Sequence, residues 1–353
     1  MSLLSDTIAA IEPMDEGAGD AAARRLDSLT KPLGSLGYLE QVVRRYAAIR
    51  HDPEARSGPA SILVFVADHG VADEGVSAYP KEVTAQMLRN IARGGAAISV
   101  LARHYGYSLK VIDAGVATDT RAEDLPGVIY RRIGPGTRNF MREPAMTAAQ
   151  AAAALEAGIE TVNEAMVDGG TLVGIGEMGI ANSTSAAALL SAITGADPAT
   201  IAGRGTGLDE DGLRRKVEVI RASHERHRAS LSDGQRLLAA LGGFEIAAMA
   251  GVCLGAAARR VPVIVDGFIA TAAAAVADRI FPGLAARMFF SHRSAEGGHA
   301  IALEHLRARP LLDLDLRLGE GTGAAMAISI IQAALAMFHD MATFAGAAVA
   351  EKI

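Results

Sequence analysis

Short apolar runs recur along the chain, and each ends abruptly in glycine or in polar residues. The runs are SILVFVADHG (61–70), LKVIDAG (109–115), TLVGIGEMG (171–179), VPVIVDGF (261–268) and ARMFFSHRS (286–294). Ala-rich segments that read as helices follow most of them. Strands that alternate with helices are typical of a mostly parallel sheet covered by helices on both faces. The pattern therefore predicts an α/β fold.

The polar residues at the ends of these runs predict where a ligand binds. In open parallel sheets, ligands bind outside the carboxyl ends of the strands. We therefore expect one site to be faced by the strand-end residues Asp68, His69, Asp113, Glu177, Asp266, Ser291 and His292.

Three further segments have a recognisable periodicity. TKPLGSLGYLEQVVRRYAAI (30–49) predicts a turn followed by an amphipathic helix, and residues 146–166 predict an Ala-rich helix on the sheet. LDLDLRL (312–318) alternates like a strand, and it suits an extended loop that delivers Glu320 equally well.

Both ends of the chain look helical. We expect residues 1–29 and 329–353 to pack together as a small helical domain. Residues 30–328 would then form the large α/β domain.

Composition narrows the classes of partner. The chain of 353 residues is 50% hydrophobic with a net charge of −6, and it has no basic run that would favour nucleic acid. A single cysteine, Cys253, excludes a disulfide framework and fits a cytoplasmic protein. The N-terminus does not resemble a signal peptide. The apolar stretch Ala324–Phe338 falls short of the ~20 residues of a membrane span and predicts a buried helix.

The glycines of GIGEMG (174–179) fit the dinucleotide-binding pattern G-x-G-x-x-G, with Asp197 placed as a ribose-binding acid. Three features weaken that hypothesis: the motif lies mid-chain, the strand before it is short, and Glu177 would repel a pyrophosphate. Backbone amides that bind a monophosphate or a sugar are the favoured interpretation. Glycines that only let strand and helix approach remain an alternative.

A second glycine loop, GRGTGL (203–208), leads into a helix. Backbone N–H groups at a helix start suit a phosphate, and Arg204 or Lys216 would add charge. A loop with a solvated basic face is the alternative.

Motifs for several other chemistries are missing. SHERH (223–227) is not HExxH, and it favours a solvated helix face over a zinc site. The P-loop and G-x-S-x-G patterns do not occur. We expect neither a metal nor a cofactor.

Glu320 stands out in LRLGEGTGAAM (316–326), where glycines surround a lone acid before an apolar helix. Desolvation by that helix would raise the carboxyl pKa, whereas a helix N-terminus would lower it. A general base poised near neutral pH could result. The alternative is a first-turn glutamate that only stabilises the helix.

The motifs together resemble one enzyme family, that of nicotinate-nucleotide–dimethylbenzimidazole phosphoribosyltransferase, which makes the lower-ligand nucleotide of cobalamin. The resemblance runs from about Leu26 to the C-terminus. It is carried by LDSLTKPLGSLG, ADHGVADEGVSAYPKEVTAQM, GIGEMGIANSTSAAAL, GRGTGL, LGGFEIAAMAGVCLGAA, VDGFI, SHRSAEGGH and LRLGEGTGAAM.

This resemblance implies a Rossmann-like sheet, a small helical domain and a homodimer. It implies transfer of the phosphoribosyl group from nicotinate mononucleotide to 5,6-dimethylbenzimidazole. Glu320 matches the family's proposed base, Glu177 and Lys216 match supporting residues, and Gln86 falls where the family contacts the benzimidazole. The expected substrate contacts are Tyr79, Gln86, Gly174, Gly176, Gly203, Arg204, Ser291, His292, Gly321 and Thr322.

The chemistry of this reaction fits a site with one base and no metal. Nicotinate leaves as a neutral ring and no pyrophosphate departs, so only the N–H proton of the attacking base must be removed. Two other classes stay open: a nicotinamide-dependent oxidoreductase built on GIGEMG, and a non-catalytic azole- or nucleotide-binding protein.

Overall fold

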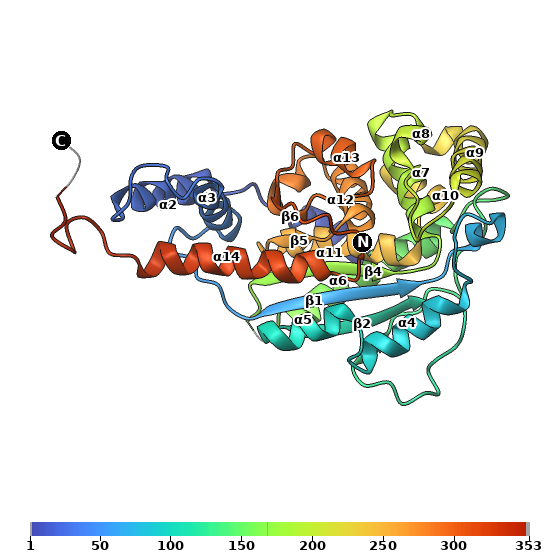
Figure 1. Cartoon of the computed structure of the whole chain (residues 1–353), viewed down its shortest axis with the longest axis horizontal. Helices are drawn as coiled ribbons and strands as arrows, with labels where there is room; N and C mark the ends of the chain where they lie inside the picture. The colour runs from blue at the N-terminus through green and yellow to red at the C-terminus, as the bar shows by residue number, and fades with distance from the viewer. Residues whose placement is uncertain (1, 168, 351–353) are drawn as a thin grey trace.

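A computed structural model describes residues 2–167 and 169–350 (Figure 1). These residues contain a seven-stranded sheet in the order β3-β2-β1-β4-β5-β6-β7, in which every neighbouring pair is parallel. This confirms the predicted α/β class. The strands are β1 (Ala60–Ala67), β2 (Ser108–Gly115), β3 (Val128–Tyr130), β4 (Leu172–Met178), β5 (Val263–Val265), β6 (Met288–His292) and β7 (Pro310–Leu312).

Successive side chains along a strand point to opposite faces of the sheet, where they belong to two separate hydrophobic cores. Along β1, Leu63 and Phe65 belong to one core, whereas Ile62 and Val64 belong to the other. All of these side chains are buried, because helices cover both faces of the sheet. The apolar run of β1 is therefore continuous rather than alternating.

The helices divide between the two faces. The core of Leu63 includes α1 (Leu3–Ala9), α6 (Ala148–Ala165), α7 (Asn182–Thr194), α8 (Pro198–Ile201), α9 (Glu210–Arg226), α10 (Gly234–Leu241), α11 (Phe244–Ala258), α12 (Phe268–Ile280) and α13 (His299–His305). The core of Ile62 includes α2 (Glu16–Ser28), α3 (Tyr38–Arg50), α4 (Glu82–Ala92), α5 (Ala97–Tyr105) and α14 (Thr322–Asp340). Short 3₁₀ turns lie at η1 (Gly70–Glu74), η2 (Arg228–Ser230) and η3 (Leu284–Arg287).

Helix α14 is, among the described helices, the one long and apolar enough to span a membrane. It lies instead along the sheet, with contacts to β1, β4, β5, β6 and β7, and Ile328 and Ile331 are fully buried. The helix therefore belongs to the core, as the sequence predicts for Ala324–Phe338.

The end of α2 and the segment after it lie against the segment that follows α14, at one side of the molecule. The Thr30 N–H donates to the Ala342 carbonyl (2.9 Å), and the Phe344 N–H donates to the Ser28 carbonyl (3.1 Å). Helices α2 and α3 pack together beside α14, whereas α1 packs on α6 and α11. A small domain of residues 1–29 and 329–353 stays a prediction. Residues 1 and 351–353 of it lie outside the described residues.

Two local expectations are wrong. Strand β4 continues through Gly174 and Gly176, so these residues form strand rather than a phosphate-binding loop. This strand pairs with β1 and β5. His224 and His227 do not lie on a solvated face, because each hydrogen bonds to a backbone carbonyl, of Ala188 and Phe140 respectively. LDLDLRL is largely an extended loop, since β7 ends at its first residue.

Candidate active site

A cleft of about 530 Å³ opens at the carboxyl ends of β4, β5 and β6, which is a size typical of small-molecule sites. Its lining residues come from loops that follow several strands, as expected for a parallel sheet. They are Ser77, Tyr79, Glu177, Met178, Gly179, Ile180, Ala181, Asn182, Ser183, Gly205, Thr206, Gly267, Phe268, Ile269, His292, Ser294, Glu296, Asp315, Leu316, Arg317, Leu318 and Gly319.

Glu320 comes directly after Gly319, which lines the cleft, and its backbone is strained. Its φ is +64°, between Gly319 at +88° and Gly321 at +86°. A side chain in this left-handed region costs on the order of 1–3 kcal/mol, and such strain clusters at functional sites. Gly319 and Gly321 adopt the left-handed region without this cost, so the loop can turn immediately before and after Glu320.

The Glu320 carboxyl is buried, with 5% of the residue exposed. Its Oε2 has no hydrogen-bond partner among the described residues. Burial raises the pKa of this carboxyl, and the Ile98 N–H, at the start of α5, lowers it. The sequence predicts that burial raises the pKa of Glu320 and that a helix N-terminus lowers it. Both effects act on this carboxyl, and burial has the larger effect.

Gly176 lets this loop approach the sheet. A Cβ at position 176 would lie well within 3.0 Å of the Gly321 nitrogen, which real Cβ atoms do not do. A Cβ at Gly174 would lie 2.6 Å from Ile62 Cδ1 and 3.2 Å from Ala324 Cβ. The glycines of GIGEMG thus serve close packing of β4 against α14 and its loop, and neither residue lines the cleft.

Asp266, at the end of β5, holds the start of α14. Its carboxylate accepts hydrogen bonds from the N–H groups of Gly321 (2.9 Å) and Ala324 (3.1 Å). Burial raises the pKa of Asp266 to about 7, although these backbone donors lower it. Asp266 is therefore a helix cap that fixes the loop of Glu320.

Glu177 is the last but one residue of β4, and its carboxyl lines the cleft. The Asn182 amide donates a hydrogen bond to its Oε2. A Cβ at Gly319 would lie 2.5 Å from Oε1, so this glycine makes room for the carboxyl. Burial, followed by the charge of Glu245, raises the pKa of Glu177 to about 8.

Lys216 of α9 lies behind the cleft wall, with 1% of the residue exposed. Its ammonium donates to Ser183 Oγ (3.0 Å) and to the Gly203 carbonyl (3.1 Å). Burial lowers the pKa of Lys216 to about 8, and the charge of Glu296 raises it. Within the described ranges no carboxylate forms an ion pair with Lys216, and both of its hydrogen-bond acceptors are uncharged.

Comparisons with known proteins show which family the chain belongs to. A family model described as "Phosphoribosyltransferase" matches residues 11–349. The nicotinate-nucleotide–dimethylbenzimidazole phosphoribosyltransferase of Chloroflexus aurantiacus is 50% identical over all of both chains, and that of Geobacter sp. strain M21 is 46% identical over 99% of each. The crystal structure of the same-named enzyme from Thermus thermophilus superposes with a TM-score of 0.90, at 43% identity over 96% of this chain and all of that one.

The chain belongs to the nicotinate-nucleotide–dimethylbenzimidazole phosphoribosyltransferase family. It is therefore a transferase with a Rossmann-like parallel sheet, as the sequence motifs imply. The oxidoreductase hypothesis loses its basis, because GIGEM of this phosphoribosyltransferase is sheet and not a dinucleotide loop.

Several expected substrate contacts of this phosphoribosyltransferase lie away from the cleft. Arg204 is half exposed and bonds to the Leu208 carbonyl and to Glu210. Gln86 is exposed on α4. Ser291, Gly321 and Thr322 are buried below the surface of the cleft. Gly203 contributes its carbonyl to Lys216. Tyr79 and His292 do line the cleft.

His292 of this cleft is neutral, because burial lowers its pKa to about 4. The Ser291 hydroxyl donates to the Asp266 carbonyl (2.8 Å), so it accepts from His292 Nδ1 (2.9 Å). The Nε2 atom then carries the free lone pair and can accept a hydrogen bond from a ligand.

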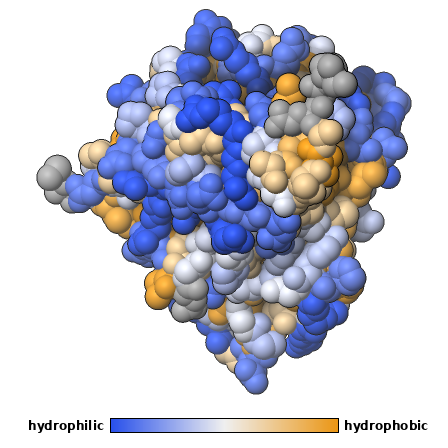
Figure 2. Space-filling view, turned by 90° about the vertical axis from the view of Figure 1, so that its left-hand side faces the viewer, coloured by the Kyte–Doolittle hydropathy of each residue, from blue (hydrophilic) through white to orange (hydrophobic). Residues whose placement is uncertain are grey.

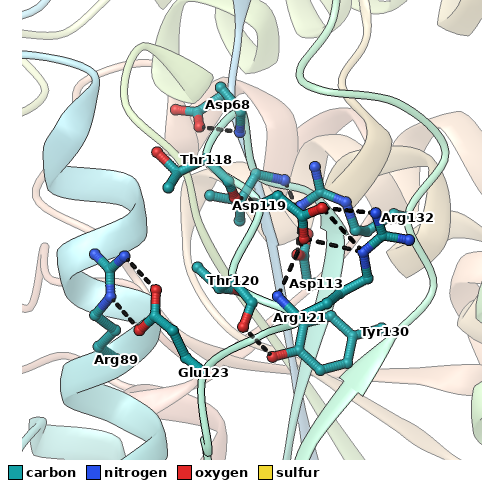
Figure 3. A network of polar contacts seen from close by, with 12 residues as sticks. Asp68, Arg89, Asp113, Thr118, Asp119, Thr120, Arg121, Glu123, Tyr130 and Arg132 are labelled. Atoms are coloured by element: carbon teal, nitrogen blue, oxygen red, sulfur yellow. Dashed lines mark hydrogen bonds and ion pairs between the residues drawn. The ribbon is translucent and has the colours of Figure 1, made fainter.

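Two of the strand-end acids hold a loop instead of facing the cleft (Figure 3). Asp68 accepts from the Ala117 N–H (2.7 Å). Asp113 accepts from the Val116 N–H (2.8 Å) and pairs with Arg132 (2.7 Å). The expectation that Asp68 and Asp113 face the site is therefore wrong.

Replacing Asp113 by alanine should destabilise the phosphoribosyltransferase by about 1–3 kcal/mol, because a buried N–H and a guanidinium lose their acceptor. Denaturant unfolding would measure this. Asp119→Ala is the matched control, since its pair with Arg121 is exposed, and it should leave the midpoint nearly unchanged. Equal midpoints for both variants would contradict the anchoring role.

Sequence reasoning missed Asn182 and Glu245 as parts of the site. The sequence does not predict the contact of Asn182 with Glu177, because Asn182 comes after a glycine motif that we expected to be a loop. Glu245 did give a signal: it is the single charged residue in FEIAAMAGVCLGAAA. A lone acid in an apolar helix is the same signal that identifies Glu320. Within the described residues, no group of three or more His, Cys, Asp or Glu side chains is arranged to hold a metal ion.

Proposed function

We propose that this enzyme transfers the 5-phosphoribosyl group from nicotinate mononucleotide to 5,6-dimethylbenzimidazole, giving α-ribazole 5′-phosphate and nicotinate. The observation that carries the proposal is the buried Glu320 carboxylate, whose Oε2 has no partner in the described part of the chain. The relatives that share this fold carry the name of this reaction. A buried acid with one oxygen left unpartnered is unfavourable for folding, so a catalytic use explains it.

The residues supply what the bond changes require. The C–N bond to the cationic pyridinium breaks, and its electron pair stays with nicotinate, which leaves as a neutral ring. The bare benzimidazole nitrogen forms the new C–N bond with its lone pair, and the N–H proton of the other ring nitrogen passes to Glu320. A positioned base typically contributes about 10²–10⁴-fold. Attack opposite the leaving ring inverts the anomeric carbon and gives the α-nucleotide.

The cleft beside Glu320 accounts for orientation of the donor. Glu177 and His292 both line this cleft. We assign contact with the ribose to Glu177, and a hydrogen-bond acceptor for the donor to His292 Nε2. Lys216 lies behind Ser183 and Gly205, at the wall that a phosphate would meet. Holding both substrates in line at the reacting carbon provides a large part of the acceleration.

Lys216→Met should raise the KM for nicotinate mononucleotide about 10- to 100-fold with a smaller change in kcat, because a phosphate loses a charged donor. Steady-state kinetics would measure this. Arg204→Met is the control, since Arg204 is engaged with Leu208 and Glu210 and should leave KM nearly unchanged. An unchanged KM in Lys216→Met with lowered thermal stability would assign Lys216 a purely structural role.

The direct test is incubation of the purified enzyme with nicotinate mononucleotide and a panel of benzimidazoles and purines. Mass spectrometry should detect a ribazole phosphate and free nicotinate in equal amounts, and NMR of the anomeric proton should report the α configuration. Absence of product with every base would refute the proposal.

The homodimer and the cytoplasmic location also belong to this proposal. The face around α2 and α3 is largely hydrophilic, but hydrophobic residues gather in one area of it (Figure 2). Exposed apolar patches mark protein interfaces more often than free surface. Light scattering of the purified enzyme would measure the oligomeric state.

A further inference from the structure

His292 is the last residue of β6, and two glycines make room for its imidazole ring. A Cβ at Gly323, in the first turn of α14, would lie 2.7 Å from the ring atom Cε1. A Cβ at Gly267, which lines the cleft, would lie 3.3 Å from both Cε1 and Nε2. The ring therefore packs against the start of the helix that follows Glu320, and its Nε2 edge borders the cleft.

The hydroxyl of Ser291 decides which nitrogen of this ring carries the hydrogen. Its Oγ lies 2.8 Å from the Asp266 carbonyl oxygen and 2.9 Å from His292 Nδ1. A carbonyl oxygen can only accept, so the single hydroxyl hydrogen points to it and Oγ accepts from Nδ1–H. Ser291 is fully buried, so solvent does not compete for these bonds. The Nε2 atom of the neutral ring is therefore a bare acceptor.

The ring stays neutral, and its Nε2 lacks a hydrogen-bond partner in the part of the chain that the structure describes. Burial lowers the pKa of His292 to about 4. The Asp266 Oδ1 atom is 3.8 Å from Nδ1, beyond hydrogen-bond distance, and it accepts from the Ala324 N–H instead. Polar groups of buried residues nearly all have a partner in native proteins, so the partner of Nε2 must come from outside the chain.

The two substrates of the proposed reaction offer few hydrogens to such an acceptor. The pyridinium nitrogen of nicotinate mononucleotide carries no hydrogen, its carboxylate is ionised, and its phosphate is mostly dianionic above about pH 7. The hydrogen-bond donors that remain are the two ribose hydroxyls and the benzimidazole N–H. The N–H proton passes to Glu320. A ribose hydroxyl is therefore the group that suits His292 Nε2.

We propose that Ser291 and His292 form a recognition site for one ribose hydroxyl of the nucleotide donor, so that the enzyme selects ribonucleotides over deoxyribonucleotides. The inference rests on the proposed function. His292 Nε2 makes the contact, and Ser291 is a positioning residue that acts only through the tautomer of His292. A site that hydrogen bonds a substrate hydroxyl rejects the analogue that lacks it, because a buried polar atom is then left unpaired. A neutral acceptor also adds no negative charge against an anionic donor.

Deoxy analogues of nicotinate mononucleotide test this site. For the 2′-deoxy or the 3′-deoxy donor, the wild-type kcat/KM should be about 10- to 100-fold below that of the parent donor. We call this ratio of kcat/KM values the hydroxyl preference. His292→Asn retains an amide N–H near Ser291 but has no atom at the position of Nε2, so the hydroxyl preference should fall by the same factor. His292→Gln, whose amide oxygen reaches that position, should restore part of it.

Two further variants separate recognition from a structural effect. Ser291→Ala leaves Nδ1–H without its acceptor and frees the tautomer, so it should lower the hydroxyl preference by less than His292→Asn does. His224→Asn is the matched control, because His224 also hydrogen bonds within the protein, at the Ala188 carbonyl, but lies outside the cleft lining. Its hydroxyl preference should equal that of the wild type. If His292 serves only the fold, His292→Asn would slow all three donors equally, and this result would overturn the proposal.

Gly267→Ala gives a second test that leaves His292 in place, in case His292→Asn does not fold. The φ of Gly267 is −102°, which alanine adopts, and the added methyl would lie 3.3 Å from Nε2 and cover it. The hydroxyl preference should fall here too, and an unchanged preference would contradict the recognition site. A wild-type enzyme that uses all three donors equally well would also contradict it. Failure to make ribazole phosphate even from the parent donor would contradict the proposed function instead, so the two failures are distinguishable.

Discussion

Replacing Glu320 by glutamine should lower kcat by about 10²–10⁴-fold, because no base then receives the N–H proton from the second ring nitrogen of the attacking benzimidazole. Glutamine has the same shape as glutamate, so binding of both substrates should change little. Initial rates of nicotinate release would measure the loss, and calorimetry with each substrate would measure binding.

The same variant should be at least as stable as the wild type. Glu320 is a buried acid whose Oε2 lacks a partner among the described residues, and a neutral amide removes the cost of desolvating a charge. The strained backbone at φ +64° is unaffected by the change. A melting temperature that stays level or rises, together with low activity, is the expected signature of a catalytic residue whose presence opposes stability.

Glu218→Gln is a suitable control, because Glu218 lies exposed on α9, away from the cleft. It should alter neither turnover nor stability. Near-normal turnover in Glu320→Gln would contradict the base assignment. Low turnover together with a large fall in melting temperature would assign Glu320 to the fold instead.

The sequence predicts the central strands well for a physical reason. Strands buried on both faces are rich in apolar residues, and β1, β4, β5 and β6 are buried along nearly their whole length, whereas β2 is buried from Val111 onward. The edge strands β3 and β7 have three residues each and are only half buried. Such short segments lack a period, and tertiary pairing alone makes them strands. The sequence therefore missed both.

The sequence likewise predicts some residues of the candidate site and misses others. Glu320 is identifiable in the sequence because its neighbours differ so much from it in polarity. The role of Gly174 and Gly176 cannot be identified in the sequence. The G-x-G-x-x-G spacing is compatible with a loop and equally with a closely packed strand. Which of these applies depends on Gly321 and Ala324, which contact β4 only after folding. Asn182 likewise gains its importance from a partner that the fold brings to it.

Replacing Gly176 by alanine should lower kcat/KM by about 10²-fold or more. A Cβ at this position overlaps the backbone at the Glu320–Gly321 peptide, and backbone cannot turn aside as a side chain can. The loop must move away from β4, and a displacement of about 1 Å at a catalytic group is enough for a loss of that size. Overpacking of this kind also costs about 1–3 kcal/mol of stability.

Gly174→Ala is the matched control for this loop. Its Cβ would meet Ile62 Cδ1 at 2.6 Å, which is the movable end of a side chain, and it would not touch the backbone of Gly321. Both variants add one methyl group to the same strand under the same helix. They differ in whether the added atom meets backbone at the base or the end of a side chain. Thermal unfolding should show a larger loss of stability for Gly176→Ala, and kinetics should show a much lower activity for the folded Gly176→Ala enzyme; equal activities would mean that the close approach of β4 to the loop does not set the position of Glu320.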